Sequence, residues 1–104
     1  MKKVYIGELS VPKESEAEFL EAARRSGSFI RTLPGFVEGF LYEKKDGESH
    51  HNFMTTAVWE SEEAFENAKA AVVLDNQRRG YDPQETAKRL KIETVRSTFE
   101  RSPY

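Results

Sequence analysis

The chain has 104 residues, a length typical of one domain, and its 38% hydrophobic and 12% aromatic content is enough for a folded core. Its 16 basic and 18 acidic residues give a net charge of −2, which argues against a cationic surface for nucleic acids or membranes. The absence of cysteine excludes disulfides, a thiolate nucleophile and Cys-ligated zinc. Neither a membrane span nor a signal peptide is indicated. We therefore expect a single cytoplasmic domain over residues 1–104, with neither a nucleic acid nor a membrane as partner.

The first part of the chain predicts a strand followed by a helix. Residues 3–11 are rich in β-branched and aromatic side chains, and the strand stops at Pro12. Residues 13–32 then place apolar side chains three and four positions apart, with acids in the first turns. Pro34 and Gly35 end this helix, because proline disfavours helical geometry in the residue before it.

The middle of the chain predicts a hairpin and a second helix. Residues 36–44 and 51–59 have the pattern of an antiparallel pair, joined by a loop that contains Asp46-Gly47. Ser61 is well placed to cap the second helix, because two acids follow it at the positive end of the helix dipole. We expect this helix to end at Gly80, after fraying in the polar stretch 75–79.

The last part of the chain predicts a short helix and a fourth strand. Asp82-Pro83-Gln84-Glu85 has the cap, the proline and the glutamate of a helix start, and residues 90–99 alternate as a strand. The order β-α-β-β-α-β predicts an α+β fold of the ferredoxin-like type. In that fold a four-stranded antiparallel sheet carries its two main helices on one face.

The predicted strands are apolar on both faces. In the second strand, alternation places Phe36, Phe40 and Tyr42 on one face, and Val37 and Leu41 on the other. Two helices can cover only one face, so roughly ten apolar side chains remain uncovered in a single copy. We therefore expect a homodimer that forms through the sheet face.

Two segments resemble the antibiotic biosynthesis monooxygenase (ABM) domain family. They are Leu33-Pro34-Gly35-Phe36 and Ala57-Val58-Trp59-Glu60-Ser61-Glu62-Glu63-Ala64-Phe65. The resemblance extends over nearly the whole chain in the order of elements, and it implies a dimeric α+β barrel. It also implies oxygenation of a small aromatic, polyketide-like phenol by dioxygen without metal, flavin or haem. Because one fold hosts several activities, a non-catalytic dimer that binds a small ligand or acts as an accessory protein remains the alternative.

The resemblance also implies three site residues. Similar enzymes have a Trp at the end of the third strand, which corresponds to Trp59, with an Asn four positions earlier and a Tyr six positions later. This sequence has Thr55 and Phe65 at those two positions. We expect Trp59 to be catalytic and Thr55 and Phe65 to bind substrate, although a buried Trp can also serve packing alone.

Histidine is the natural candidate for a general base near neutral pH, and the chain has two, His50 and His51. Adjacent strand residues point to opposite faces, so these two cannot chelate one metal, and we expect no metal site. In the predicted strand His51 shares a face with Phe53, Thr55 and Trp59, which makes it the candidate base. The alternative is a pair of solvated histidines at the end of a hairpin.

Further side chains could contact a ligand. Tyr5 and Tyr42 have phenolic hydroxyls, and we include Tyr42 among the expected substrate-binding residues, with packing as the alternative. Arg78 is expected to hold an anionic substrate, with an ordinary charge at a helix end as the alternative.

Two other functions are disfavoured by the sequence. Haem-degrading relatives use an Asn, a Trp and a haem-ligating His where this chain has Gly7, Ala68 and approximately Arg78, so we expect no haem cofactor. Residues 4–9 are similar to the first-strand motif of RNA-recognition domains. The third strand, however, lacks the glycine, the basic residue and the spaced aromatics of the partner motif.

Overall fold

The computed structural model describes all residues, 1–104, and confirms the predicted order of elements. The elements are β1 (Lys3–Ser10), the short 3-10 turn η1 (Lys13–Ser15), α1 (Glu16–Ile30), β2 (Phe36–Glu43), β3 (Phe53–Trp59), α2 (Glu62–Arg79), α3 (Pro83–Leu90) and β4 (Glu93–Glu100).

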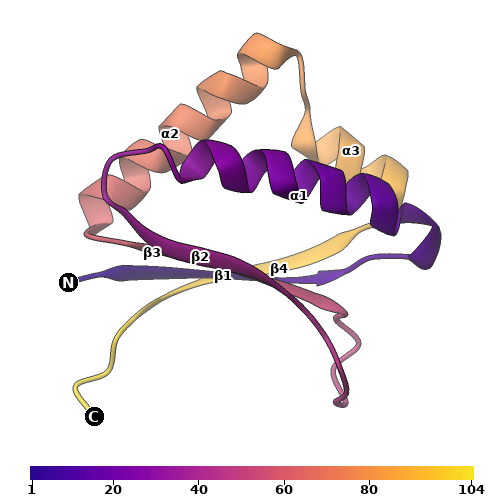
Figure 1. Ribbon diagram of the computed structural model, residues 1–104, viewed down its shortest axis with the longest axis horizontal. Coiled ribbons are helices and arrows are strands. Elements are labelled where there is room, and N and C mark those ends of the chain that lie inside the picture. Colours follow the sequence, from indigo (N-terminus) through magenta and orange to yellow (C-terminus); the bar gives the residue numbers. More distant parts are fainter.

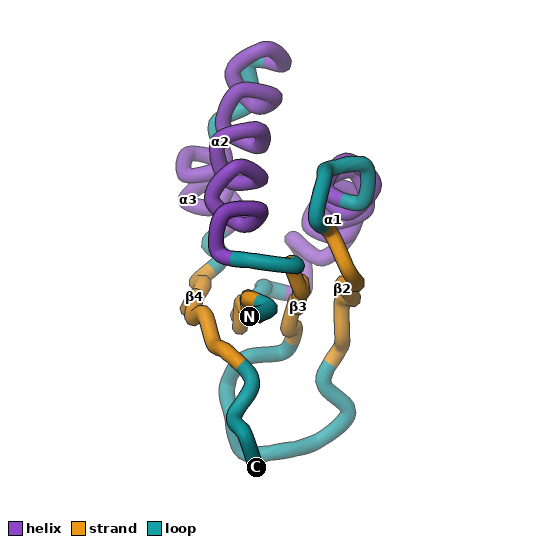
Figure 2. The backbone as a smooth tube through the Cα atoms, turned by 90° about the vertical axis from the view of Figure 1, so that its left-hand side faces the viewer, coloured by secondary structure: helices purple, strands orange, loops and turns teal.

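The four strands form one antiparallel sheet in the order β2-β3-β1-β4. All three helices lie on the same side of this sheet (Figure 1), and the view along the sheet shows the two layers separately (Figure 2). The ferredoxin-like α+β fold is therefore confirmed. The other side, which we call the open face, carries no helix.

Local signals in the sequence explain where α2 begins and ends. The Ser61 hydroxyl accepts a hydrogen bond from the Ala64 amide at 3.0 Å, and Gly80 ends the helix in the left-handed region at φ 65°. The expected fraying is wrong, because Arg79 donates to the Asp75 carboxylate at 3.0 Å and the helix stays regular to its last residue. No helix of the chain combines the length and the apolar character that a bilayer crossing needs.

A bulge in β2 changes the faces predicted for that strand. The register with β3 shifts between Phe36 and Glu38. Phe36 therefore packs under the helices, edge-on against Trp59 with ring centroids 5.3 Å apart. Phe40 and Tyr42 share the open face instead, with centroids 6.1 Å apart. The prediction that these three aromatics lie on one face is wrong, because the extra residue reverses the alternation.

The core of one copy is small. Only 11 of 104 residues are buried, and seven of the hydrophobic ones form two separate clusters under the helices. The first cluster comprises Ala57, Trp59, Phe65 and Ala68, and the second comprises Val11, Phe19 and Phe53. On the open face, large apolar side chains remain about half exposed: Phe40 51%, Tyr42 47%, Val95 50% and Phe99 52%. The uncovered apolar sheet face predicted from the strand pattern is present.

Candidate functional site

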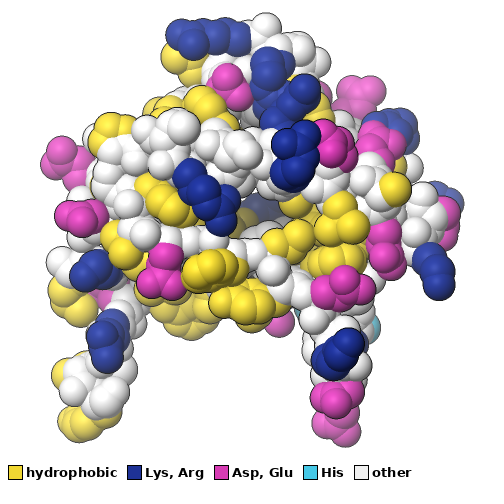
Figure 3. All heavy atoms as spheres, in the orientation of Figure 1, with side chains coloured by type: hydrophobic (Ala, Val, Ile, Leu, Met, Phe, Trp, Pro, Cys, Tyr) yellow, Lys and Arg dark blue, Asp and Glu magenta, His cyan; other side chains and the backbone are white.

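A cavity of about 910 Å³ lies between the sheet and the layer formed by α1 and α2. It is visible as a hollow between the helices and the strands (Figure 3). Twelve of its 22 lining residues are hydrophobic, and the first core cluster forms part of its wall. Its size and apolar lining are those of a site for a small organic molecule.

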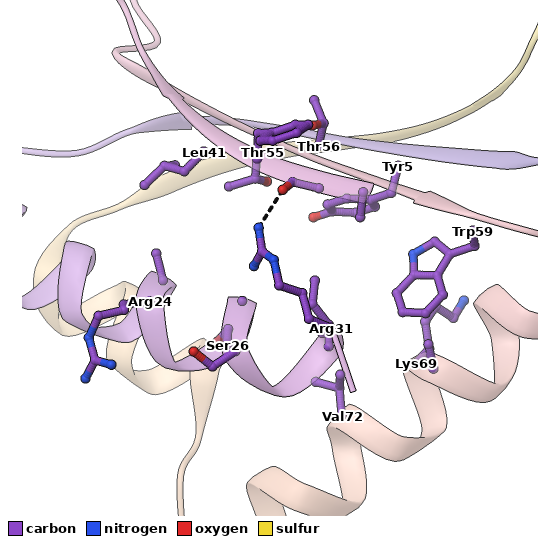
Figure 4. Close-up of a pocket in the computed structure, with 18 of the residues that line it drawn as sticks. Tyr5, Arg24, Ser26, Arg31, Leu41, Thr55, Thr56, Trp59, Lys69 and Val72 are labelled. Carbon is purple, nitrogen blue, oxygen red and sulfur yellow. Dashed lines mark hydrogen bonds between the residues drawn. The ribbon is translucent and has the colours of Figure 1, made fainter. Parts of the chain in front are cut away.

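The floor of the cavity is a row of side chains across the helix-facing side of the sheet. The strand register aligns Leu41, Thr55, Gly7 and Arg96, one from each strand. Gly7 has no side chain, and the hydroxyls of Thr55 and Tyr5 occupy the space above it. A Cβ at that position would lie 2.9 Å from Thr55 Oγ1 and 3.0 Å from Tyr5 Oη. Neither hydroxyl has a hydrogen-bond partner in the protein, so both are available to a ligand (Figure 4).

The aromatic wall of the cavity is formed by Trp59 and Phe65. Trp59 is 3% exposed, and Phe65 is 8% exposed with its ring centroid 6.4 Å from that of Tyr5. The structure therefore brings Trp59, Phe65 and Thr55 together in one cavity. Tyr5, whose hydroxyl could contact a ligand, lines the same cavity.

All the charged side chains that line the cavity are cations, namely Arg24, Arg31, Lys69 and Arg96. Arg24 hydrogen-bonds Glu21, and this bond lowers the pKa of the glutamate carboxyl. Lys69 Nζ lies 3.3 Å from the carboxylate of an acid three residues earlier on α2. Arg31 and Arg96 have no carboxylate partner, so their charges are free to act on a bound molecule.

Arg31 is held across the gap between helix and sheet. It follows the last residue of α1, and its Nη2 donates to the Gly39 carbonyl of β2 at 2.6 Å (Figure 4). Its guanidinium lies 5.7 Å from the centroid of the Phe36 ring. Gly27 makes room for it, since a Cβ there would lie 2.8 Å from Arg31 Nη1. One donor of five is therefore committed, and the group is positioned at the cavity.

The structure places His51 outside this cavity. β3 begins only at Phe53, so the alternation that was expected to place His51 on the face of Thr55 and Trp59 does not reach it. Its Nδ1 lies 3.1 Å from Ser49 Oγ and 3.9 Å from the Glu8 carboxylate. The predicted position of His51 is wrong, because this part of the hairpin is not extended strand.

Two other expected contacts also lie elsewhere. Tyr42 projects from the open face and borders, with His51, a separate hollow of about 210 Å³. Arg78 is exposed in the last turn of α2 and does not line the cavity. Tyr5, the aromatic of the RNA-binding-like motif, faces the helices, so it is not presented on the open face to stack on a base. No three His, Asp or Glu side chains cluster closely enough to hold a metal ion.

Sequence reasoning missed the two free arginines. Arg96 alternates with Thr94 and Thr98, and a polar strand face normally indicates solvent. Only the pairing of Arg96 with Gly7 shows that it faces the cavity. Arg31 comes after the helical pattern has ended, and its role depends on the carbonyl of a residue in the next strand.

Several known proteins are similar to this chain. Residues 4–72, more than half of the chain, match the sequence profile of the family described as Antibiotic biosynthesis monooxygenase (ABM). No curated protein matches significantly. The structure is similar to a variant of SnoaB, a cofactor-independent oxygenase from Streptomyces nogalater, with TM-score 0.73 and 24% identity over 99% of this chain and 95% of that one.

Two further structures show how varied similar proteins are. A protein of unknown function from Bacteroides thetaiotaomicron, described as a possible oxidoreductase, has TM-score 0.74 and 16% identity over 96% of this chain and 97% of that one. The haem-degrading protein Rv3592 from Mycobacterium tuberculosis has TM-score 0.59 and 26% identity over 66% of this chain and 78% of that one. On the profile match, this chain belongs to the antibiotic biosynthesis monooxygenase (ABM) family.

Proposed function

We propose that the protein is a cofactor-independent monooxygenase that oxidises a small electron-rich phenol or anthrone-type aromatic with dioxygen. The observation that carries this proposal is the cavity of about 910 Å³, whose lining has an aromatic wall, the unpartnered hydroxyls of Thr55 and Tyr5, and cations but no acids. Membership of the ABM family and the similarity to a cofactor-independent oxygenase support it.

The reaction needs no metal or organic cofactor if the substrate supplies the electrons. A phenolate or enolate gives one electron to dioxygen, and the resulting substrate radical and superoxide combine at a ring carbon as a hydroperoxide. Loss of water then leaves a carbonyl, so that a CH₂ group and O₂ become C=O and H₂O. The protein must exclude bulk water, hold the ring and stabilise the substrate anion.

The residues of the cavity suit these tasks. Trp59 and Phe65 provide a flat apolar surface for an aromatic ring. Thr55 Oγ1 and Tyr5 Oη both lie over Gly7 and can both donate to a substrate oxygen that carries negative charge. His51 is not part of this proposal, because it lies near Glu8 outside the cavity.

Oxygen uptake with anthrone or 1-naphthol as substrate tests the proposal directly. We expect consumption of oxygen by the metal-free protein, and a loss of at least about tenfold in kcat/KM for Tyr5→Phe and for Thr55→Val, since each removes a donor to the anion. Tyr104→Phe is the matched control, because it removes an equivalent hydroxyl from a fully exposed side chain. No uptake above the background of the substrate alone would contradict the proposal.

A non-catalytic ligand-binding protein is the second candidate. It is favoured by one observation, namely that no His, Asp or Glu lines the cavity to take a proton from the substrate. The same assay separates the two candidates. Tight binding of these aromatics without oxygen consumption would assign the chain to this second class.

Haem degradation does not fit the residues of the cavity. The positions at which haem-degrading relatives carry Asn, Trp and His are occupied here by Gly7, Ala68 and approximately Arg78. Gly7 and Ala68 offer no ligand, and Arg78 lies outside the cavity. Neither histidine lines it, so an imidazole ligand to haem iron is not available there.

We also propose that the single domain of residues 1–104 works as a homodimer through the open face. Phe40, Tyr42, Val95 and Phe99 leave about half of their surface exposed on this face. The β2–β3 loop and the C-terminal residues extend past the sheet on the same side (Figure 1). They flank an apolar surface that a second sheet can cover by face-to-face packing.

A further inference from the structure

The cavity has a net positive charge, although the whole chain has a net charge of −2. The titratable side chains that line it are Arg24 from α1, Arg31 just after α1, Lys69 from α2, Arg96 from β4 and Tyr5 from β1, while β2 and β3 contribute none. Four cations without a carboxylate among them favour a ligand that brings its own negative charge.

Two of these cations are already neutralised locally. Arg24 is bonded to Glu21, and Lys69 is paired with Glu66, in each case an acid three residues away on the same helix. Arg31 and Arg96 have no such partner. The positive charge available to a ligand therefore comes chiefly from these two arginines.

Arg31 and Arg96 act from opposite sides of the cavity. Arg31 is bonded to β2 through the Gly39 carbonyl, and Arg96 belongs to β4 beside Gly7. β2 and β4 are the two edges of the sheet, roughly 14 Å apart at the usual strand spacing. Arg31 is the better anchored of the two, since its hydrogen bond fixes the guanidinium while its other N–H groups remain free.

We propose that the cavity binds its aromatic ligand as the anion, a phenolate, with Arg31 as the principal contact and Arg96 as a second source of positive charge. The phenol O–H bond breaks with the electron pair left on oxygen, and the proton goes to solvent. A side chain that acts as a base is then unnecessary. This inference refines the proposed function and takes the phenol from it, but the anion preference is tested by binding alone.

Two features of the cavity shift the pKa of a bound phenol in opposite directions. The twelve hydrophobic lining residues remove water and favour the neutral phenol. The two free arginines favour the phenolate. The phenolate is the preferred ligand if the effect of the arginines on this pKa is larger than the effect of removing water.

The first experiment uses 7-hydroxycoumarin, whose phenol and phenolate have separate absorption bands, titrated with the protein at several pH values. We expect the phenolate to bind at least about tenfold more tightly than the phenol, which corresponds to a fall of about one unit in the pKa of the bound dye. A pKa of the bound dye that is unchanged or raised, or a failure of the phenolate to bind, would overturn the inference.

Variants assign the effect to Arg31. Arg31→Gln should remove most of the preference for the phenolate, and Arg96→Gln should remove less. Arg31→Lys, which keeps the positive charge, should retain part of the preference that Arg31→Gln loses. Arg25→Gln is the matched control, because Arg25 is exposed on α1, does not line the cavity and carries the same charge. An equal loss in Arg25→Gln would show that net charge alone is responsible, and would overturn the role of Arg31. Thermal melts verify that each variant is folded.

A pair of competitors separates anion recognition from the acid–base properties of the dye. 2-Naphthoate and 2-naphthamide have nearly the same shape and differ in charge. We expect the carboxylate to displace the dye at least about tenfold better than the amide in the parent protein, and to lose most of this advantage in Arg31→Gln. Equal competition in the parent protein would count against anion recognition. Absence of oxygen uptake would refute the proposed reaction and leave these binding results unaffected.

Discussion

Gly7 pairs directly with Thr55 between β1 and β3, and a Cβ on Gly7 would lie 2.9 Å from Thr55 Oγ1. The same Cβ would lie 3.0 Å from Tyr5 Oη. The missing side chain thus lets the two hydroxyls lie over the Gly7 backbone at the floor of the cavity. Glycine weakens the interior of a strand and often marks a place where other atoms approach the backbone closely, as these two hydroxyls do here.

Gly7→Ala should impair the site with little effect on the fold. The added methyl displaces the ends of two side chains that can rotate, and alanine suits a strand better than glycine does, so we expect the melting temperature to change by only a few degrees. Both proposed donors to the substrate oxygen are displaced, so kcat/KM in the oxygen-uptake assay should fall by at least about tenfold. A variant with unchanged activity would show that the substrate oxygen does not bind at these two hydroxyls.

Trp59 should report on the occupancy of the cavity. It is the only tryptophan in the chain, it is 3% exposed, and it lines the cavity. An aromatic ligand in the cavity would contact the indole, so titration with 2-naphthoate should change tryptophan emission in proportion to binding measured by calorimetry. Binding by calorimetry with no change in emission would mean that the ligand occupies another site.

Substitution of Trp59 should affect stability as well as binding. The ring packs edge-on against Phe36 in the first core cluster, so Trp59→Ala should cost about 3–5 kcal/mol of unfolding free energy. Trp59→Phe should cost less, since it keeps an aromatic ring in that place. Urea denaturation followed by circular dichroism measures both values. A cost below about 1 kcal/mol for Trp59→Ala would contradict the packing described here.

A charge on the open face should separate the proposed dimer. Phe99 of β4 is 52% exposed on that face, opposite Val4, and a carboxylate there would be buried against apolar surface in a dimer. Light scattering should give twice the chain mass of 12.0 kDa for the parent protein and the mass of one chain for Phe99→Asp.

Leu74→Asp is the control for that experiment. Leu74 is 49% exposed on α2, away from the open face, so the same substitution should leave the parent dimer intact. Dissociation of both variants, or of neither, would count against assembly through the open face. A parent protein that is monomeric at micromolar concentration would refute the dimer itself.

An ion pair between α1 and α3 should make stability depend on pH in acid. Arg89 hydrogen-bonds the Glu18 carboxylate at 2.6 Å and thereby lowers the pKa of Glu18. The folded pKa lies below the unfolded one, so the contribution is present above the usual carboxyl range and is lost as the pH falls through the folded pKa.

The corresponding measurement compares Glu18→Gln with the parent protein. The parent should have the higher urea midpoint at pH 7, and the difference should vanish well below the usual carboxyl range. The difference will be small, because the pair is exposed. Glu48→Gln, in the exposed hairpin loop, should show no difference at either pH. A Glu18→Gln difference that persists in acid would mean that the ion pair is not its cause.

The sequence predicts the elements of this fold well because their signals are local. The cap at Ser61 and the left-handed end at Gly80 depend on residues within one helical turn, and both are present. Asp82 likewise accepts from the amides of Gln84 and Glu85. Which side chains lie on which face of the sheet was harder to predict, since one bulge between Phe36 and Glu38 reverses the alternation beyond it.

The site was predictable only where it follows regular strand geometry. Trp59 and Thr55 each lie two residues from the buried Ala57 in β3, on the side that the alternation assigns to them. His51 precedes the strand, so its orientation depends on Ser49 and the hairpin turn rather than on a period of two. Arg31 reaches its position through a carbonyl on another element, a contact that no pattern in the sequence records.

The most direct test of the proposed reaction is oxidation of anthrone by the metal-free protein under ¹⁸O₂, with the product analysed by mass spectrometry. The mechanism predicts a quinone that carries one labelled oxygen atom, the second atom of dioxygen being released as water. A product without the label, or a labelled product formed no faster than in the absence of protein, would contradict it.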